Sequence, residues 1–458
     1  MKDDGVIFIS IDDNEALNFK KICDDIFGED CFIADITVVN NLKGRNDKKY
    51  IATANERLLM YVKSYQFEEC GLELPSERLL EFKEEDGFGK YRLLGLRKRG
   101  GADTRTQRPK MYFPLYADPE TGKVSLQKNE TFNIEIFPKK SDGTEGCWRW
   151  GNSTVEIRID SLISKPVGSN GRFDVFEKDY LELNGQLRRI KPKSVMNGAD
   201  YSTDGATKAY RALMKGLDFS SPKPVPFLMD LISYSSSDNE PFIICDFFAG
   251  SGSTAHAVFA QNAKNNGKRR FIVAQLPETL DETSDSYKAG YKNIADISKE
   301  RIRRAAKKIQ EENPEYKGDL GFKVFKLDSS NIKRWEADFD TLEEDLLNAV
   351  DYIKQDRSED DLLYELCLKT GLDLTIKVEK RTIAGKTVHI LGMGYLVVCL
   401  QDNIDMDVIN GIGALKEELA PEDGMRVVFK DDGFKDDVVK TNALQTLKRY
   451  GIEDIKSL

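Results

Sequence analysis

The sequence is poor in metal ligands: it has only two histidines, His256 and His389, in 458 residues. Its seven cysteines are scattered, and no two of them are spaced as Cys-x-x-Cys. A protein zinc site gathers several such ligands, so this composition argues against a metal centre. Scattered free thiols are typical of a reducing compartment, and we expect a cytoplasmic protein.

Long apolar runs are also missing. No segment approaches the roughly 20 apolar residues that span a membrane, and the first residues do not resemble a signal peptide. The net charge of −10 disfavours nonspecific coating of nucleic acid, although it leaves room for a local basic face. The length allows two to four domains, and 40% hydrophobic residues can build their cores.

One stretch has the pattern of a ligand-binding turn. An apolar run at 241–245 predicts a buried strand, Asp-Phe-Phe-Ala-Gly-Ser-Gly-Ser-Thr follows at 246–254, and 255–262 predict a helix. The glycines let the backbone approach a ligand, and free N–H groups at a helix start favour a polar or anionic partner. The turn lacks the motifs of nucleoside triphosphate and dinucleotide sites. Taken alone, the turn is explained equally well as an ordinary glycine turn between a strand and a helix.

Alternating strands and helices flank a more irregular region. Strands are expected at 6–11, 32–39, 57–63 and 270–276, and helices at 15–27, 206–213, 225–232 and 291–309. The strands on either side of the glycine turn would form one parallel βαβ unit. We expect the basic residues of the last helix to form its solvated face; they are Arg301, Arg303, Arg304, Lys307 and Lys308.

The irregular region carries a basic loop. Its candidates for DNA contact are Arg97, Lys98, Arg99, Arg105, Arg108 and Lys110. Only Asp103 opposes them locally, and aromatic residues follow at Tyr112, Phe113 and Tyr116. Arginine and lysine beside aromatic residues suit contacts with phosphates and base edges, and the alternative is a solvated charged loop.

The last third begins with an acidic segment, from Glu336 to Asp361, that predicts charged helix faces or a linker. A small α/β module follows. Its expected helices are at 362–368 and 436–450, and its expected strands are at 372–380, 387–391, 395–400 and 426–429. No catalytic constellation is visible there, so docking or dimerisation is its expected role.

The glycine turn, followed by Gly-Lys-Arg-Arg-Phe-Ile-Val-Ala-Gln-Leu-Pro-Glu at 267–278, resembles the S-adenosylmethionine site of amino-methylating DNA methyltransferases. Further motifs at 4–15, 55–63 and 221–224 follow the order of the permuted class of these enzymes. They look closest to the modification subunit of type III restriction–modification systems. The resemblance covers nearly the whole chain and is weakest at about 66–190, where such enzymes differ in target recognition.

This resemblance implies an α/β, Rossmann-like S-adenosylmethionine-dependent methyltransferase fold. The expected domains are two halves of the core at 1–64 and 194–335, an inserted mixed α/β target-recognition region at 65–193, and a small α/β docking or dimerisation domain at 336–458. The implied cofactor contacts are Asp246, Phe247, Phe248, Gly250, Ser251, Gly252, Gln275 and Glu278, with Phe219 and Lys223 as weaker candidates. Either Gln275 or Glu278 would lie near the ribose.

The family's catalytic tetrapeptide, Asp-Pro-Pro-Tyr or a close variant, precedes these motifs in the permuted class, but this sequence contains no Pro-Pro. The tetrapeptide holds the amine of a flipped-out base in line with the methyl group. We therefore expect no catalytic residue in this chain, a core without its central strand, and a chain that is inactive and poorly stable alone. A separate N-terminal fragment, a truncation and a misplaced start would each account for this.

The expected function is transfer of methyl groups from S-adenosylmethionine to adenine N6 at specific sites of double-stranded DNA. A second copy of the chain and a restriction subunit are the expected partners. Two alternatives stay open: a non-catalytic remnant that binds DNA or other subunits, and a cytosine-N4 methyltransferase.

Overall fold

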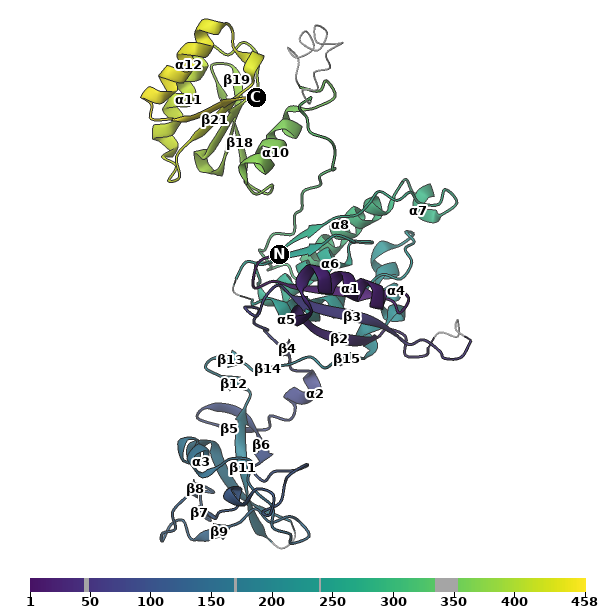
Figure 1. Ribbon diagram of the computed structural model, residues 1–458, viewed down its shortest axis with the longest axis vertical. Helices are drawn as coiled ribbons and strands as arrows, with labels where there is room; N and C mark the ends of the chain where they lie inside the picture. Colours follow the sequence, from purple (N-terminus) through teal and green to yellow (C-terminus); the bar gives the residue numbers. More distant parts are fainter. Residues whose placement is uncertain (45–48, 169–170, 239, 334–352) are drawn as a thin grey trace. The chain divides into compact units, whose positions relative to one another are not determined.

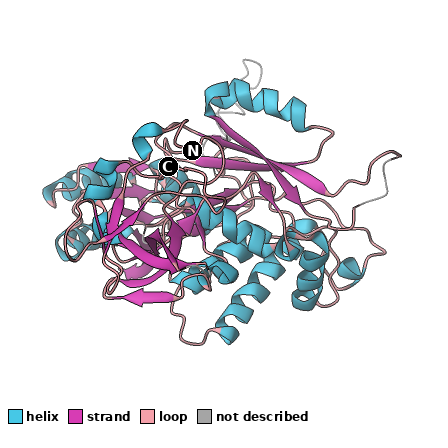
Figure 2. Cartoon of the chain, turned by 90° about the horizontal axis from the view of Figure 1, so that it is seen from below, coloured by secondary structure: helices cyan, strands magenta, loops and turns pink. Residues whose placement is uncertain are grey.

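The computed structural model describes residues 1–44, 49–168, 171–238, 240–333 and 353–458 (Figure 1). Their contacts form two compact units, Met1–Leu320 and Gly321–Leu458. Helices and strands are mixed throughout, so the fold is α/β (Figure 2). The finer division into four domains stays a prediction, and most of the acidic segment lies outside the described residues. No helix among those residues is long and apolar enough to cross a membrane.

The first sheet has the order β1-β3-β2-β15. Its strands are β1 (Val6–Ile11), β3 (Asn55–Val62), β2 (Phe32–Val39) and β15 (Val195–Met196). Helix α1 (Ala16–Phe27) covers one face, where Cys23 and Tyr61 are buried. Helix α5 (Val225–Ser235) packs on the other face through Phe227. These elements confirm the predicted strands and helices of this part of the chain. Burial follows the apolar pattern only in part, since Leu17, Ile22 and Ile26 of α1 are exposed.

The second sheet pairs β16 (Ile243–Asp246) with β17 (Arg270–Val273) in parallel. Helix α6 (Ser253–Asn265) connects the two strands, which confirms the βαβ unit. Helix α8 (Ile294–Glu312) packs against α6 and against α4 (Thr203–Met214), and the short α7 (Asp285–Lys288) precedes it. Leu228 of α5 packs in the cores of both sheets, so this helix joins them.

One face of the second sheet is open among the described residues. Along both strands, exposed and partly buried side chains alternate. Ile243 and Ile272 belong to the exposed set, with 55% and 57% of their surface accessible, while Ile244 and Phe271 pack in the core formed with α5 and α6. A parallel sheet is usually covered on both faces, so this one is only half covered.

The irregular region enters and leaves the core through paired strands, β4 (Leu72–Glu73) and β14 (Arg189–Ile190). Within it lie one sheet of order β10-β11-β6-β5 and another of order β8-β7-β9. Their strands are β5 (Glu84–Asp86), β6 (Gly89–Gly95), β7 (Leu115–Ala117), β8 (Val124–Ser125), β9 (Ile134–Ile136), β10 (Leu162–Val167) and β11 (Arg172–Tyr180). The remaining elements are α2 (Ser76–Leu79), α3 (Asn152–Ile157) and the hairpin of β12 (Glu182–Leu183) and β13 (Gln186–Leu187). Trp148 is fully buried in this region's core, and its indole N–H donates to the Phe113 carbonyl.

The unit Gly321–Leu458 contains a five-stranded sheet of order β18-β19-β20-β21-β22. Its strands are β18 (Val378–Ile383), β19 (Lys386–Leu391), β20 (Leu396–Cys399), β21 (Arg426–Phe429) and β22 (Asp454–Ser457), and its helices are α10 (Glu359–Thr370), α11 (Met406–Leu419) and α12 (Asp437–Arg449). Two buried clusters, one with α10 and one with α11 and α12, cover the sheet. The strand predicted at 372–380 is wrong in its bounds, since it starts at Val378.

Candidate functional site

The glycine turn connects β16 to α6, and its backbone requires glycine. Gly250 and Gly252 have φ values of +52° and +77°, in the left-handed region that L side chains rarely adopt. Gly252 also lies against α8: a Cβ there would approach Ser298 Oγ to 2.8 Å and Ile302 Cγ1 to 3.3 Å. The turn is therefore both sharply bent and closely packed.

Asp246 ends β16 and shapes the turn that follows it. Its carboxylate accepts hydrogen bonds from Thr254 Oγ1 at 2.5 Å and from the Phe248 N–H at 3.1 Å. Phe247 and Phe248 are 58% and 79% exposed. Next to this acid, then, two aromatic side chains are open to a ligand, while the carboxylate itself is held in place.

The end of β17 meets the glycine turn. The Gly250 N–H donates to Gln275 Oε1 at 2.7 Å, and Gln275 Nε2 donates to Glu278 Oε1 at 3.4 Å. Because parallel strands end at the same edge of a sheet, side chains distant in sequence gather here. The ring of Phe219 also reaches the turn, since a Cβ on Gly250 would lie 3.4 Å from its Cζ.

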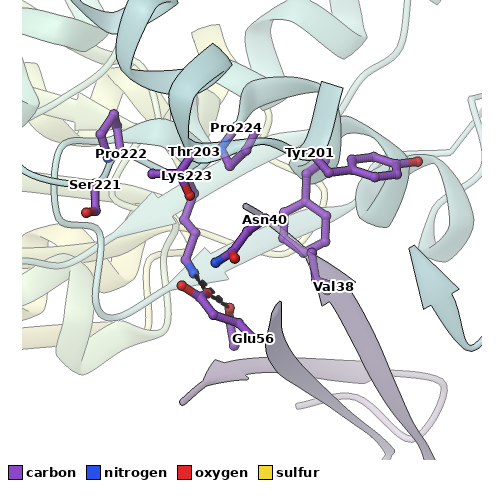
Figure 3. Close-up of a pocket in the computed structure, with 11 residues that line it drawn as sticks. Val38, Asn40, Glu56, Tyr201, Thr203, Ser221, Pro222, Lys223 and Pro224 are labelled. Atoms are coloured by element: carbon purple, nitrogen blue, oxygen red, sulfur yellow. Dashed lines mark hydrogen bonds and ion pairs between the residues drawn. The ribbon is translucent and has the colours of Figure 1, made fainter. Parts of the chain in front are cut away.

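Lys223 lies elsewhere, in a pocket beside the first sheet (Figure 3). Its ammonium donates to Ser10 Oγ at 2.9 Å and forms an ion pair with Glu56. Asn40 and Tyr201 also line this pocket. The structure thus connects Lys223 to β1 and β3, and its contact with a cofactor stays a prediction.

The basic loop is less positive than its sequence indicates. The Arg105 guanidinium pairs with Glu145 at 3.0 Å and lies over the Tyr112 ring, 4.4 Å from its centroid. Asp103 instead pairs with Lys140. The expectation that Asp103 alone opposes the loop is wrong, because a bridge between Thr104 and Gly146 brings Glu145 beside it.

The other candidates for DNA contact differ in their exposure. Arg99 and Lys110 are exposed, whereas Lys98 and Arg108 are half-buried. Arg97 is also half-buried, and its backbone forms a β-bridge with Trp148. Their contact with DNA stays a prediction.

Arg301 is the residue that the sequence-based interpretation missed. It was expected on the solvated face of its helix, but it is only 3% exposed. Its Nη1 donates to Ser251 Oγ and to Ser253 Oγ, both at 2.6 Å. The helical period contained the signal, because Arg301 follows the buried Ile297 by four residues and precedes the buried Ala305 by four.

His256 lies on the first turns of α6. Burial and the positive charges of Arg301 and Lys308 lower its pKa to about 3. The imidazole is therefore neutral near pH 7, as expected for a residue that packs within a helix.

Comparison with known proteins agrees with the resemblance to DNA methyltransferases seen in the sequence. A DNA methylase family model matches residues 1–308. The chain is 31% identical over 403 residues to the type III restriction-modification enzyme EcoPI Mod subunit of Escherichia phage P1, covering 87% of this chain and 61% of that protein. It is 31% identical over 422 residues to the EcoP15I Mod subunit of Escherichia coli, with the same coverage.

A further relative is the type II methyltransferase M.KpnI of Klebsiella pneumoniae, which is 35% identical over 303 residues, or 66% of this chain and 69% of that protein. The chain spans about three fifths of the length of the EcoPI and EcoP15I subunits. The predicted resemblance to modification subunits of type III systems is confirmed. The chain belongs to the DNA methylase family.

Proposed function

We propose that the edge formed by residues 246–254 and 275–278 binds S-adenosylmethionine, within a Rossmann-like methyltransferase core. The observation that carries this proposal is the hydrogen bond from the Gly250 N–H to Gln275, which joins the glycine turn to the next strand. Similarity to type III Mod subunits supports methylation of adenine N6 at specific DNA sites.

The residues present fit such a cofactor. No described side chain caps the N-terminus of α6, so its first N–H groups favour the carboxylate of the donor's amino-acid end. Asp246 would hold the ammonium of that end, and the exposed Phe247 ring offers an apolar surface. When bound, S-adenosylmethionine supplies an electrophilic methyl group, and these residues orient it.

Replacing Asp246 with alanine is expected to weaken binding of S-adenosylmethionine about tenfold or more, as for a lost charge-assisted contact. Isothermal titration of both proteins measures the difference. Asp281→Ala is the matched control, because Asp281 also accepts bonds from a threonine hydroxyl and a backbone N–H, both of Thr283. Equal affinity of wild type and Asp246→Ala would remove the assignment of the turn.

We also propose that residues 65–193 read the DNA and that residues 336–458 dock a second copy or a restriction subunit. The recognition region carries the candidate DNA contacts on its basic loop, including the exposed Arg99 and Lys110. The C-terminal unit has its own buried core, as expected of a separate docking domain.

A polypeptide segment carrying the catalytic tetrapeptide would complete the site, by adding a strand between β16 and β1. Both are outer strands of their sheets among the described residues, and the exposed Ile243 and Ile272 offer an apolar face beside β16. We expect methyl transfer only after such a segment is added, with N6-methyladenine as the modified nucleoside in digested DNA. Methylation by the purified chain alone would contradict this, and N4-methylcytosine would favour the cytosine alternative.

A further inference from the structure

Arg301 is a buried cation directly behind the glycine turn. It extends from α8 towards the N-terminus of α6, where its Nη1 donates to the hydroxyls of Ser251 and Ser253. Both serines are themselves buried, at 2% and 6% exposure. The guanidinium therefore holds the residues on either side of Gly252 through short hydrogen bonds, in a site from which water is largely excluded.

The charge of Arg301 is not balanced within the described structure. No described carboxylate lies within ion-pair distance of it, and its Nε is buried without a hydrogen-bond partner. Its other neighbours are the Tyr210 ring, 5.4 Å from the guanidinium carbon, and the neutral His256. Burial lowers its pKa to about 10, so it is still charged near pH 7.

A buried, unpaired charge is expensive, and proteins rarely keep one unless a ligand or partner compensates it. Here the positive charge adds to the partial positive charge of the N-terminus of α6, which has no side-chain cap within the described part of the chain. The Arg301 guanidinium and the N-terminus of α6 together favour a bound anion at the glycine turn. Asp246 lies at the same turn, and its carboxylate accepts hydrogen bonds from Thr254 and Phe248, but among the described contacts it forms no ion pair with Arg301.

We propose that Arg301 is a positioning residue of the methyl-donor site that fixes the glycine turn and makes it selective for a donor with a free carboxylate. This inference rests on the proposed function of the turn. The serine hydroxyls connect Arg301 to the turn, and its charge acts on the ligand's carboxylate through them. A purely structural Arg301 would support binding of every donor analogue equally.

The test compares S-adenosylmethionine with its decarboxylated form, which keeps the sulfonium, the adenosine and the ammonium. Titration of the full chain is expected to show that wild type prefers the carboxylated ligand. In Arg301→Met this preference falls about tenfold, because only the carboxylated ligand loses an interaction. Arg301→Lys keeps the charge and retains most of the preference. Arg303→Met is the control, since Arg303 lies on the same helix with its side chain 58% exposed.

The possible outcomes separate the two proposals. If wild type binds neither ligand, the proposed function of the turn is wrong. If wild type prefers the carboxylated ligand and a folded Arg301→Met keeps the same ratio or loses both ligands equally, the role of Arg301 is wrong. Should Arg301→Met fail to fold, Arg301→Gln takes its place, because glutamine removes the charge but still offers an N–H donor to the serines.

Discussion

Gly252→Ala is expected to lower the free energy of unfolding of the unit Met1–Leu320 by about 2–5 kcal/mol. Two effects add. A left-handed φ of +77° costs a side-chain-bearing residue about 1–2 kcal/mol. The new Cβ would also lie 2.8 Å from Ser298 Oγ and 3.2 Å from the Ser298 carbonyl, and such overpacking costs about 1–3 kcal/mol. Urea denaturation followed by tryptophan fluorescence and circular dichroism measures the loss.

Gly290→Ala separates the two effects. Gly290 has a φ of +99°, but apart from its chain neighbours no described heavy atom lies within 4 Å of the position that its Cβ would take. It should therefore lose only the conformational part, about 1–2 kcal/mol. If both variants were destabilised equally, the close packing of the glycine turn on α8 would contribute nothing, and the turn could move aside to admit a side chain.

Arg269→Met is expected to be the more severe change, with a loss of about 3–5 kcal/mol, as for breaking a buried ion pair. The Arg269 side chain is fully buried and pairs with Asp238 at 2.6 Å. It also donates to Ser236 Oγ at 2.7 Å and to the carbonyls of Ser236 and Ser237. Methionine has a similar length but donates to none of these acceptors, so the carbonyls of Ser236 and Ser237 lose this donor and Asp238 keeps only its contacts with Asn265 and Arg189.

Lys268→Met is the matched control, because Lys268 is the neighbouring basic residue and is exposed. A surface change of this kind is expected to stay within about 0.5 kcal/mol. Thermal unfolding monitored by circular dichroism compares both variants with wild type. Equal melting temperatures for all three proteins would show that Arg269 does not hold the end of α5 against the start of β17.

The two buried arginines show where sequence reasoning succeeds and where it ends. Apolar periodicity predicted the strands and helices of the core, because burial follows that pattern directly. Arg269 and Arg301 interrupt the pattern with charges whose partners are distant: Asp238 lies 31 residues before Arg269, and Ser251 lies 50 residues before Arg301. The helical period places Arg301 on the buried face of α8, but it does not identify the distant hydroxyls to which the guanidinium donates.

The candidate site divides in the same way. A short glycine-rich turn between strand and helix is a local feature, so residues 246–254 were predictable. The contacts of Gln275 with Gly250 and of Glu145 with Arg105 depend on strand pairing, so the sequence did not predict them. The short strand β22 was missed for a related reason, since Asp454–Ser457 is polar and forms only by pairing with β21 at the sheet edge.

The paired strands β4 and β14 have a consequence for how the chain can vary. Residue pairs Leu72 with Ile190 and Glu73 with Arg189 bring the ends of the irregular region together at the core. The entropy of closing a loop grows only with the logarithm of its length, by about 0.6 kcal/mol per doubling. A region of another length or sequence, held by the same two strands, would therefore leave the stability of the core nearly unchanged. The segment between β4 and β14 can therefore be replaced as one unit without rebuilding the core.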